Sequence, residues 1–498
     1  MTILSHMPYK RHLSKIHFLP LHTIFLICII IASFYFRFYN TPNRYGFDPD
    51  PVRDALTIYQ GATHFQFPLT GAMSGIAPFT FGPWYYYQLI LFQILFPLNY
   101  APWIFIGLSS VLAVFVMYKI GSSLENKWFG LMLALFMALS PSETGQTQGL
   151  SNPDLVPLYT TLIIWIFIML MKKNTASWWL LIWGVVFGIG INIHYQIILL
   201  LPLFLFYLYF NSSHILKKSI HFFLGLGITF IPLLLFNLFT NWHTVRGVLY
   251  YVTIGRATTY IPNSWKIYLF SFWLPYLSYI FGLTNLNQII LFFLSIMGLV
   301  YASFIKKLHR IYLIFILTFI LDFFILRYFL ANRDYYYYLF LHPIIFILVG
   351  FALWQLRTFR FGKVAILFIL FFIIIGMIPQ DQQRLVSRVD NIGMSNQAEF
   401  LMNKFPNRPI SIYACSNNRV VNLAEGIVFF LKNNHRLGMG EGTKIAIINN
   451  DCKTTLSGFA KYEEYSEVEL TNDLALVNQK KLMLITPKEI YNANVSWW

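Results

Sequence analysis

Acidic residues are scarce in this chain, which has 20 Asp and Glu against 36 Lys and Arg among 498 residues. Charged residues make up only 11% of the chain and hydrophobic residues 57%, whereas a soluble domain carries about 25% charged residues. This composition excludes an ordinary soluble enzyme and predicts a polytopic helical membrane protein. The net charge of +16 does not indicate a nucleic-acid partner, because the basic residues fall largely in short loops between apolar runs.

Cysteine is also scarce, and three residues, Cys28, Cys415 and Cys452, exclude a cysteine-rich scaffold. Cys28 lies inside the first apolar run, and we expect it to be a buried apolar residue. Cys415 and Cys452 lie near the C-terminus, where two alternatives stay open. They form a disulfide in an oxidising compartment, or they are two free thiols.

Apolar runs near the spanning length of about 20 residues predict about eleven transmembrane helices. They lie at about 19–36, 102–119, 128–140, 154–171, 177–193, 196–210, 219–239, 286–304, 311–330, 335–355 and 363–379. The Lys and Arg residues of the short loops place the N-terminus in the cytoplasm and the C-terminus outside the plasma membrane. The segment Trp84–Leu98 begins with aromatic residues, and we expect it to lie at the membrane interface rather than to cross.

Two domains follow from the change of composition near residue 380. Residues 1–379 form the transmembrane domain, with large outer loops at 40–101 and 240–285. Residues 380–498 are predicted to be a small extracytoplasmic α/β domain. Its strand-like runs are Ile410–Ala414, Lys444–Ile448 and Leu482–Thr486, and a helix-like run lies at Asn422–Leu431.

The few acids of the transmembrane domain gather on one side. Twelve of the twenty acids follow residue 379. The remaining eight are Asp48, Asp50, Asp54, Glu125, Glu143, Asp154, Asp322 and Asp334. On the expected topology six of them face outward, with Glu125 inside and Asp322 within a span. This placement indicates a polar reaction chamber at the outer face. The alternative is that these acids are solvated loop residues with no part in a reaction, which we expect for Glu143.

The string Phe47-Asp48-Pro49-Asp50 in the first outer loop holds the strongest catalytic candidates. Asp50 precedes Pro51 and suits a helix N-cap. The functional alternative is a carboxylate base that takes a proton from an acceptor, with Asp48 assisting and Arg53 orienting it or contacting phosphate. Asp54 is expected to be solvated. We expect no required cofactor, because two carboxylates without a clear third ligand make a poor site for a metal ion. The alternative is that Asp48 and Asp50 hold Mg²⁺ or Mn²⁺ on a sugar phosphate.

Further candidates for substrate binding lie at the outer ends of spans. Asn152 and Asp154 begin one span, where they also suit a helix cap, and His194 lies between two spans. Arg327 and Arg333 are the cationic candidates for a lipid phosphate, since charges inside spans are costly and usually functional. Asp322 is a candidate partner of Arg327. Tyr85 suits sugar stacking, and a headgroup belt is its alternative.

The ordered motifs FDPDPVRDA, GPWYYY, SNPDLVPL and NIHYQ resemble the GT-C superfamily of polyprenyl-phosphate-sugar-dependent glycosyltransferases. The nearest group is glycosyltransferase family 39, which includes protein O-mannosyltransferases, together with the related lipid A aminoarabinose transferases. The resemblance covers roughly residues 20 to 350 and implies that Asp50 is the catalytic acid, followed by Arg53. Many relatives have Asp-Glu or Asp-Gln where this chain has Asp50-Pro51, so the share of Asp48 stays open.

These features predict an inverting glycosyltransferase at the outer leaflet of the membrane. Its donor would be a sugar on a polyprenyl phosphate, with an unknown acceptor, Asp50 as base, and Arg333, Arg327 and His194 holding the phosphate. One rival is a transporter or flippase of lipid-linked sugars, which would show inverted repeats and broken helices near mid-membrane. Another rival is a non-catalytic assembly protein.

Overall fold

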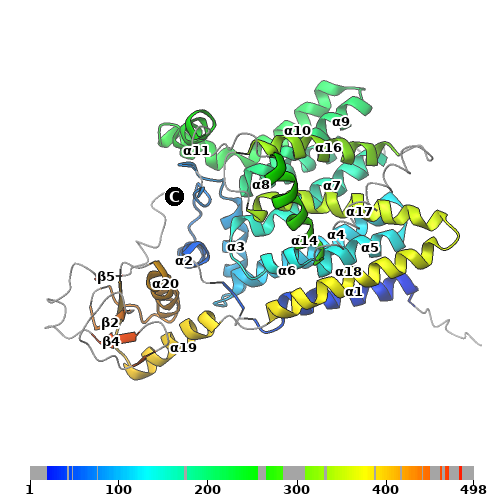
Figure 1. Ribbon diagram of the computed structural model, residues 1–498. Helices are drawn as coiled ribbons and strands as arrows, with labels where there is room; N and C mark the ends of the chain where they lie inside the picture. The colour runs from blue at the N-terminus through cyan, green and yellow to red at the C-terminus, as the bar shows by residue number, and fades with distance from the viewer. Residues whose placement is uncertain are drawn as a thin grey trace, which may run out of the picture.

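Long helices run side by side through most of the molecule (Figure 1). The computed structural model describes residues 19–41, 44–46, 49–75, 77–172, 177–255, 265–283, 309–329, 334–385, 389–415, 418–439, 441–448, 460–461, 466–469 and 482–484. The longer helices of the bundle are α1 (Leu21–Phe38), α4 (Ala101–Leu124), α5 (Lys127–Leu139), α7 (Val156–Lys172), α8 (Trp178–Ile193), α10 (Ile215–Thr229), α16 (Arg310–Arg327), α17 (His342–Gln355) and α18 (Gly362–Leu385).

Shorter elements connect these helices, and some of them gather at one end of the bundle. Several of them lie at its left-hand end in Figure 1, among them α2, α3 and α11. The other elements of this part of the chain are α2 (Pro49–His64), α3 (Trp84–Leu95), α6 (Pro141–Gln146), η1 (Asn152–Leu155), η2 (Tyr195–Leu200), α9 (Leu201–Phe210), α11 (Ile231–Phe239), α12 (His243–Tyr250), η3 (Tyr251–Gly255), η4 (Ile267–Trp273), α14 (Leu274–Phe281), η5 (Tyr335–Leu341) and η6 (Leu356–Thr358).

Several helices are suited to cross a membrane, so the chain is a multi-pass membrane protein. Among the described residues, four helical stretches are long and apolar enough: Leu21–Phe38, Ala101–Leu124, Asn152–Lys172 and Tyr335–Thr358. The pair α10 and α11 forms a fifth if its 55° bend lies within one crossing. Each predicted span coincides with one or two helices, except 286–304, which lies outside the described residues. The count of eleven crossings stays a prediction.

The aromatic segment after the first outer loop forms α3, which has 12 residues. At 1.5 Å per residue such a helix reaches only about 18 Å, well short of the hydrocarbon core. One face of α3 is buried, through Tyr85, Tyr86, Leu89 and Ile90, while Leu95 at its end is exposed. The length of α3 agrees with a helix that packs on the bundle without crossing.

Two arginines near the end of the first apolar run, Arg37 and Arg44, are buried and bind the ends of helices. Arg37 donates to the carbonyl oxygens of Met137 (3.2 Å) and Ala138 (2.9 Å) at the end of α5, and to Ser110 Oγ (2.8 Å). Arg44 donates to the carbonyl oxygens of Phe36 (3.1 Å) and Tyr39 (2.8 Å) at the end of α1. Because the last carbonyls of a helix lack partners within it and carry partial negative charge, both guanidinium groups stabilise helix ends.

Three expectations for single residues are wrong. Glu143 is buried rather than solvated, and its Oε1 lies 2.5 Å from Nδ1 of the buried His342, so that it joins α6 to the first residue of α17. Asp322 is buried, but no hydrogen bond joins it to Arg327 or to any other described residue. Cys28 is exposed on α1.

A five-stranded sheet follows the bundle, with strand order β3-β4-β2-β1-β5. Its strands β1 (Ile410–Cys415) and β2 (Thr443–Ile448) are parallel, and α20 (Asn418–Asn433) connects them. The other pairings are antiparallel. The predicted strands at 410, 444 and 482 coincide with β1, β2 and β5 (Leu482–Leu484), and the helix-like run lies within α20. The strands that the prediction lacked are β3 (Ala460–Lys461) and β4 (Ser466–Glu469).

Helix α20 fixes the sheet region against the bundle. Its Phe429 and Phe430 rings lie 6.1 Å from the rings of Trp103 and Tyr100, respectively, at the start of α4. The same helix packs against α2 and against α19 (Val389–Lys404). The prediction that Cys415 and Cys452 form either a disulfide or two free thiols lies outside the described residues, because Cys452 is not among them.

The buried position of Arg37 predicts a loss of stability when its charge is removed. The substitution Arg37→Met should lower the free energy of unfolding by about 3 kcal/mol, because it leaves two helix-terminal carbonyls without their donor. Thermal unfolding of the purified protein in detergent measures the effect. The exposed Arg360, replaced in the same way, is the control. Equal melting temperatures for both variants would contradict this role of Arg37.

Candidate active site

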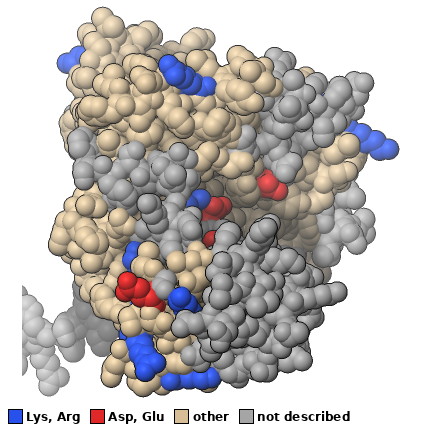
Figure 2. Space-filling view, turned by 90° about the vertical axis from the view of Figure 1, so that its left-hand side faces the viewer, with Lys and Arg blue, Asp and Glu red and all other residues tan. Residues whose placement is uncertain are grey.

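Two cavities open among the elements at the α2 end of the bundle. The main cavity has a volume of about 690 Å³ and is lined by the first outer loop, η1, η2, η3, η5 and residues around them. The side cavity, of about 390 Å³, lies between the start of α2 and the segment from Gly145 to Asp154. Three residues line both cavities: Asp50, Gln146 and Ser151. Figure 2 shows acidic and basic side chains within a recess of this face.

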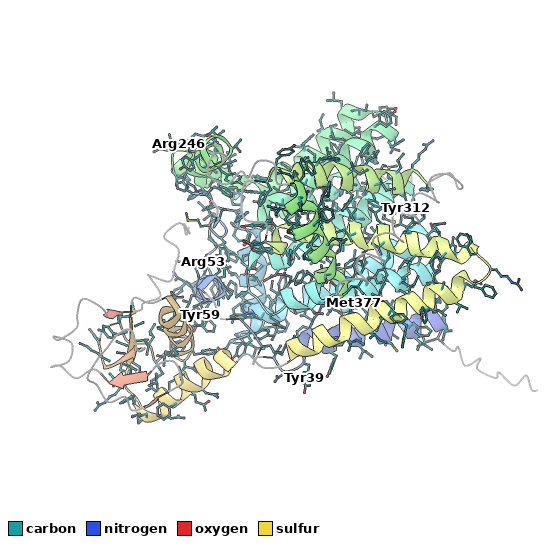
Figure 3. All side chains as sticks on the ribbon, in the orientation of Figure 1. Tyr39, Arg53, Tyr59, Arg246, Tyr312 and Met377 are labelled. Atoms are coloured by element: carbon teal, nitrogen blue, oxygen red, sulfur yellow. The ribbon has the colours of Figure 1, made fainter. Side chains whose placement is uncertain are left out.

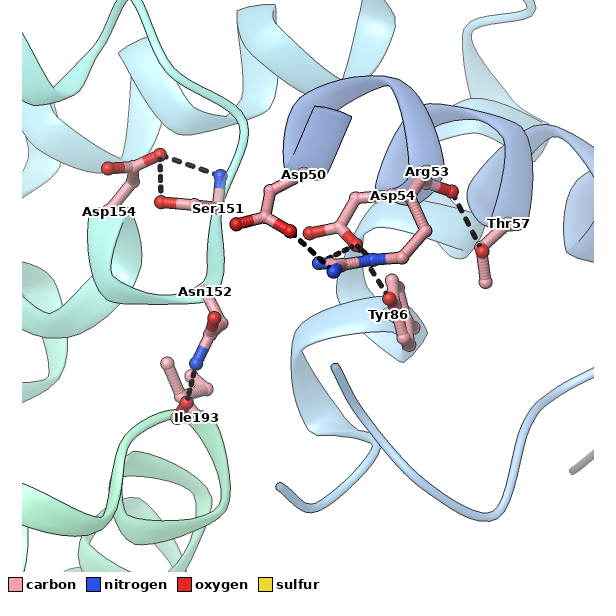
Figure 4. Close-up of polar contacts among 9 residues, drawn as sticks. All are labelled: Asp50, Arg53, Asp54, Thr57, Tyr86, Ser151, Asn152, Asp154 and Ile193. Carbon is pink, nitrogen blue, oxygen red and sulfur yellow. Dashed lines mark hydrogen bonds and ion pairs between the residues drawn. The ribbon is translucent and has the colours of Figure 1, made fainter. Parts of the chain in front are cut away.

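A charge cluster in the first two turns of α2 holds Asp50 in place (Figure 4). Arg53 donates through Nη1 to Asp50 Oδ1 at 2.6 Å, and its Nε and Nη2 lie 2.9 and 2.7 Å from Asp54 Oδ1. Tyr86 on α3 donates to the same oxygen of Asp54 at 2.7 Å. The Asp54 side chain is fully buried, whereas that of Asp50 is 71% exposed. Asp54 is therefore not the solvated acid that the sequence suggested, and it anchors Arg53.

The exposed carboxylate of Asp50 keeps one oxygen for other partners. Its Oδ1 accepts from Arg53, while Oδ2 makes no hydrogen bond to any described residue. Helix α2 begins at Pro49, so Asp50 lies in the first turn and pairs with Arg53 instead of capping the helix. Burial raises the pKa of Asp54, and the positive charge of Arg53 opposes that rise. Asp50 thus presents a carboxylate to both cavities, and its ion pair with Arg53 holds it in position.

The wall opposite α2 is fixed by hydrogen bonds to backbone atoms. Asp154 Oδ2 accepts from the backbone N–H of Ser151 (2.8 Å) and from its hydroxyl (3.0 Å), which closes a capping box at the start of η1. Asn152 donates through Nδ2 to the carbonyl oxygen of Ile193 at 2.7 Å and so ties η1 to the end of α8. Asp154 therefore forms the helix cap that the sequence offered as the alternative to substrate binding. The residue also lines the side cavity.

His194 lies between α8 and η2 with aromatic rings on two sides. Its ring stacks on Phe81 at 5.4 Å, and the ring of Tyr337 lies 5.9 Å away. Burial lowers the pKa of His194 to about 3, so the imidazole is neutral at physiological pH. As a neutral ring it can offer a single hydrogen bond to a ligand.

The hairpin-like segment before α3 closes the cavity from a third side. Tyr195 donates from its hydroxyl to the carbonyl oxygen of Thr80 at 2.7 Å. The backbone N–H of Gly82 donates to the carbonyl oxygen of Asn192 at 3.0 Å. A Cβ atom at Gly82 would lie 1.6 Å from Asn192 Oδ1, so only glycine allows this approach.

The structure brings most of the predicted site residues together. Asp50, Arg53, Asn152 and His194 line the main cavity, and Asp154 lines the side cavity. Asp48 and Arg333 lie outside the described residues.

Two of the predicted substrate-binding residues line neither cavity. Tyr85 is fully buried in the core, so its placement indicates packing rather than sugar stacking. Arg327 is buried beneath Trp265, with its guanidinium carbon 5.3 Å from the ring centroid.

The sequence interpretation missed several lining residues, among them Gln146, Ser151, Gln196 and Asp334. Asp334 had been noted only as one of the outward-facing acids. Gln196 stands inside the motif NIHYQ, two positions after the selected His194, so position in the chain was an available signal. Among the residues that the structure describes, no group of three His, Cys, Asp or Glu side chains could hold a metal ion. A Mg²⁺ or Mn²⁺ site at Asp48 and Asp50 stays untested, because Asp48 is not described.

Comparisons with known proteins agree with this architecture. Residues 83–238 match a family described as dolichyl-phosphate-mannose-protein mannosyltransferase, a range that contains Asn152, Asp154 and His194 but not Asp50. No curated protein matches the sequence. Two crystal structures of ArnT from Cupriavidus metallidurans are similar to the chain in fold.

The apo form of ArnT has a TM-score of 0.59 at 12% identity, and the form bound to undecaprenyl phosphate has a TM-score of 0.57 at 13% identity. Each comparison covers 91% of this chain and 98% of the other. The predicted resemblance to GT-C membrane glycosyltransferases close to family 39 is confirmed.

The buried, neutral His194 predicts a specific pH dependence of stability. Its pKa in the folded protein, about 3, lies below the ordinary value of 6.5, so the unfolded chain binds the extra proton first as the pH falls. Stability should therefore decrease between pH 7 and pH 5 by about 2 kcal/mol from this residue alone.

Replacing His194 by Phe keeps an aromatic ring and should remove that part of the decrease. Melting temperatures at pH 7 and pH 5 for the native protein and the variant measure it. The exposed His64 on α2, replaced by Phe, is the matched control. An unchanged pH dependence in the His194→Phe protein would show that His194 titrates alike in both states.

Proposed function

From a GT-C fold whose exposed carboxylate lies where two cavities meet, we propose that this protein is an inverting glycosyltransferase. It moves a sugar from a polyprenyl phosphate to an acceptor at the outer face of the membrane. The observation that carries the proposal is that Asp50 lines both the main and the side cavity. A base must touch the acceptor while the anomeric carbon of the donor lies within reach, and a junction of two cavities provides both positions.

The donor is assigned to the main cavity and the acceptor to the side cavity. The main cavity is lined by several aromatic rings, including Phe81, Tyr195 and Tyr337, with a few polar groups between them, which is typical of a site for a small organic ligand. ArnT, a protein of similar fold, has been crystallised with undecaprenyl phosphate. That finding supports a donor carried on a polyprenyl phosphate.

In the proposed reaction Asp50 accepts the proton of an acceptor hydroxyl through its Oδ2 atom. The acceptor oxygen then attacks the anomeric carbon from the side opposite the phosphate, and the bond between that carbon and the phosphate oxygen breaks. The phosphate leaves as an anion, so it needs cations or hydrogen-bond donors rather than a general acid. We assign Arg333 and the neutral His194 to the phosphate, and Asp48 to a supporting role beside Asp50.

We further propose an extracytoplasmic position for the site and for the α/β region after residue 380. Loops predicted to lie outside contribute Asp50, Ser151, His194 and Asp334 to one cavity. This supports a position of these loops on the same side of the membrane. Glu125, predicted to lie inside, pairs with Arg357 of another inner loop at 3.2 Å. Tyr312, whose hydroxyl donates to Glu125, lies on the opposite side of the bundle from Arg53 (Figure 3).

Helix α20 is proposed to contribute to selection of the acceptor. It packs against α2, which carries Asp50. Burial and the negative charge of Asp50 raise the pKa of Glu425 on α20 to about 7, so this carboxyl group is electrostatically linked to Asp50. The region after residue 380 is thus suited to define one side of the approach to the base.

Replacing Asp50 by Asn should reduce sugar transfer by at least about 100-fold, because an amide cannot accept the proton. Transfer of radiolabelled sugar from polyprenyl-phosphate donors by the purified protein, with cell-envelope extract as the source of acceptor, is the measurement. The exposed Glu399 on α19, replaced by Gln, is the matched control and should leave transfer unchanged. Full transfer by the Asp50→Asn protein would remove Asp50 from the reaction.

Orientation in the membrane has its own test. A reporter enzyme that is active only in the cytoplasm should be active when it is fused after residue 173. The fusion point lies in the loop that carries Lys172 and Lys173, and basic short loops face the cytoplasm. The same reporter fused after residue 439 should be inactive. Activity in the second fusion alone would reverse the proposed topology.

A further inference from the structure

Gln196 in η2 has an amide group that no part of the protein satisfies. The residue lines the main cavity, two positions after His194. Both Nε2 and Oε1 are buried and have no hydrogen-bond partner among the described residues. Of the amide side chains that the structure describes, it is the one with both ends in this condition.

Such an arrangement is costly in a folded protein. Buried polar groups are nearly always paired, and leaving one unpaired costs about 1–3 kcal/mol. The neighbouring polar groups of the same wall have partners within the protein: Asn152 donates to Ile193, and Tyr195 donates to Thr80. The wall is therefore well ordered around Gln196, and its amide is the group left over for a ligand.

The chemistry of an amide restricts what that ligand is. Nε2 donates hydrogen bonds and Oε1 accepts them, so the matching ligand offers an acceptor and a donor close together. Adjacent hydroxyl groups on a sugar ring offer both. An ionised phosphate only accepts, and a polyprenyl chain does neither, so neither of these satisfies Oε1.

We propose that Gln196 binds two adjacent hydroxyl groups of the donor's sugar ring and so sets the preference of the main cavity for a sugar-bearing lipid. This assignment rests on the proposed glycosyltransferase function. The apolar faces of the ring contact the aromatic residues around Gln196, which include Phe81, Tyr195 and Tyr337. Gln196 contributes to binding and to sugar specificity, while the proton transfer stays with Asp50.

The test uses Gln196→Met, which keeps the shape of the side chain and removes the amide. Binding of undecaprenyl phosphate, undecaprenyl-phosphate mannose and undecaprenyl-phosphate glucose to the purified full-length protein is measured side by side. The variant should bind the preferred sugar-bearing lipid about 10- to 100-fold more weakly, and undecaprenyl phosphate as tightly as the native protein does. Its melting temperature without ligand should be equal or higher, because an unpaired amide has been removed.

Two further variants separate binding from folding. Gln93→Met removes a buried amide that donates to the carbonyl oxygen of Leu98 at 3.1 Å, so it should lower the melting temperature and leave the preference for sugar unchanged. Gln196→Asn keeps the amide but withdraws it by one methylene group. It should weaken binding of the sugar-bearing lipid as Gln196→Met does.

The outcomes distinguish this assignment from the function on which it rests. If the native protein prefers a sugar-bearing lipid and both Gln196 variants keep that preference in full, Gln196 does not bind the sugar. If Gln196→Met loses stability and affinity for all three lipids equally, the residue is structural and the assignment is likewise overturned. If the native protein binds neither sugar-bearing lipid more tightly than undecaprenyl phosphate, the proposed function itself is contradicted.

Discussion

The ion pair between Arg53 and the buried Asp54 is the interaction on which the rest of the site depends. A fully buried carboxylate is tolerated only with strong partners, and Asp54 has two, the guanidinium group of Arg53 and the hydroxyl of Tyr86. Because these contacts fix one edge of the guanidinium, its remaining nitrogen, Nη1, is directed to Asp50 at 2.6 Å. An exposed carboxylate with little restraint of its own thus acquires a defined position at the meeting point of two cavities.

The walls around that carboxylate are built from the ends of helices rather than from their middles. Asn152 ties η1 to the end of α8, Asp154 closes the cap of η1, and Arg37 completes the end of α5 that leads into α6. Glu143 joins α6 to the start of α17, directly after the tyrosines of η5 that line the main cavity. Hydrogen bonds and ion pairs inside an apolar bundle are stronger than in water, so they hold these helix ends in one arrangement.

Much of this could be predicted from the sequence, because its signals are strong where a membrane imposes them. The length of apolar runs predicts the helices, and the strand-like runs at 410–414 and 444–448 coincide with strands β1 and β2. The order of FDPDPVRDA, SNPDLVPL and NIHYQ identified Asp50, Arg53, Asn152 and His194, which the fold places around one cavity. These predictions use properties that belong to a single stretch of chain.

The features that the sequence did not predict are pairings between distant segments. Glu143 and His342 are 199 positions apart, and Arg37 reaches carbonyls 100 and 101 positions away. Nothing in the sequence near Asp54 distinguishes a solvated helix acid from a buried anchor, since the difference comes from Tyr86 on the next helix. The orphaned amide of Gln196 is invisible in sequence for the same reason, because satisfaction of a polar group is a property of the packed structure.

The most direct measurement is a structure, determined by cryo-electron microscopy, of the Asp50→Asn protein with a polyprenyl-phosphate sugar bound. The proposed mechanism predicts a sugar ring inside the main cavity, with its anomeric carbon facing residue 50 and its phosphate on the opposite side of that carbon. A sugar bound outside the main cavity, or one that turns its phosphate toward residue 50, would contradict the role of Asp50 as the base that activates the acceptor.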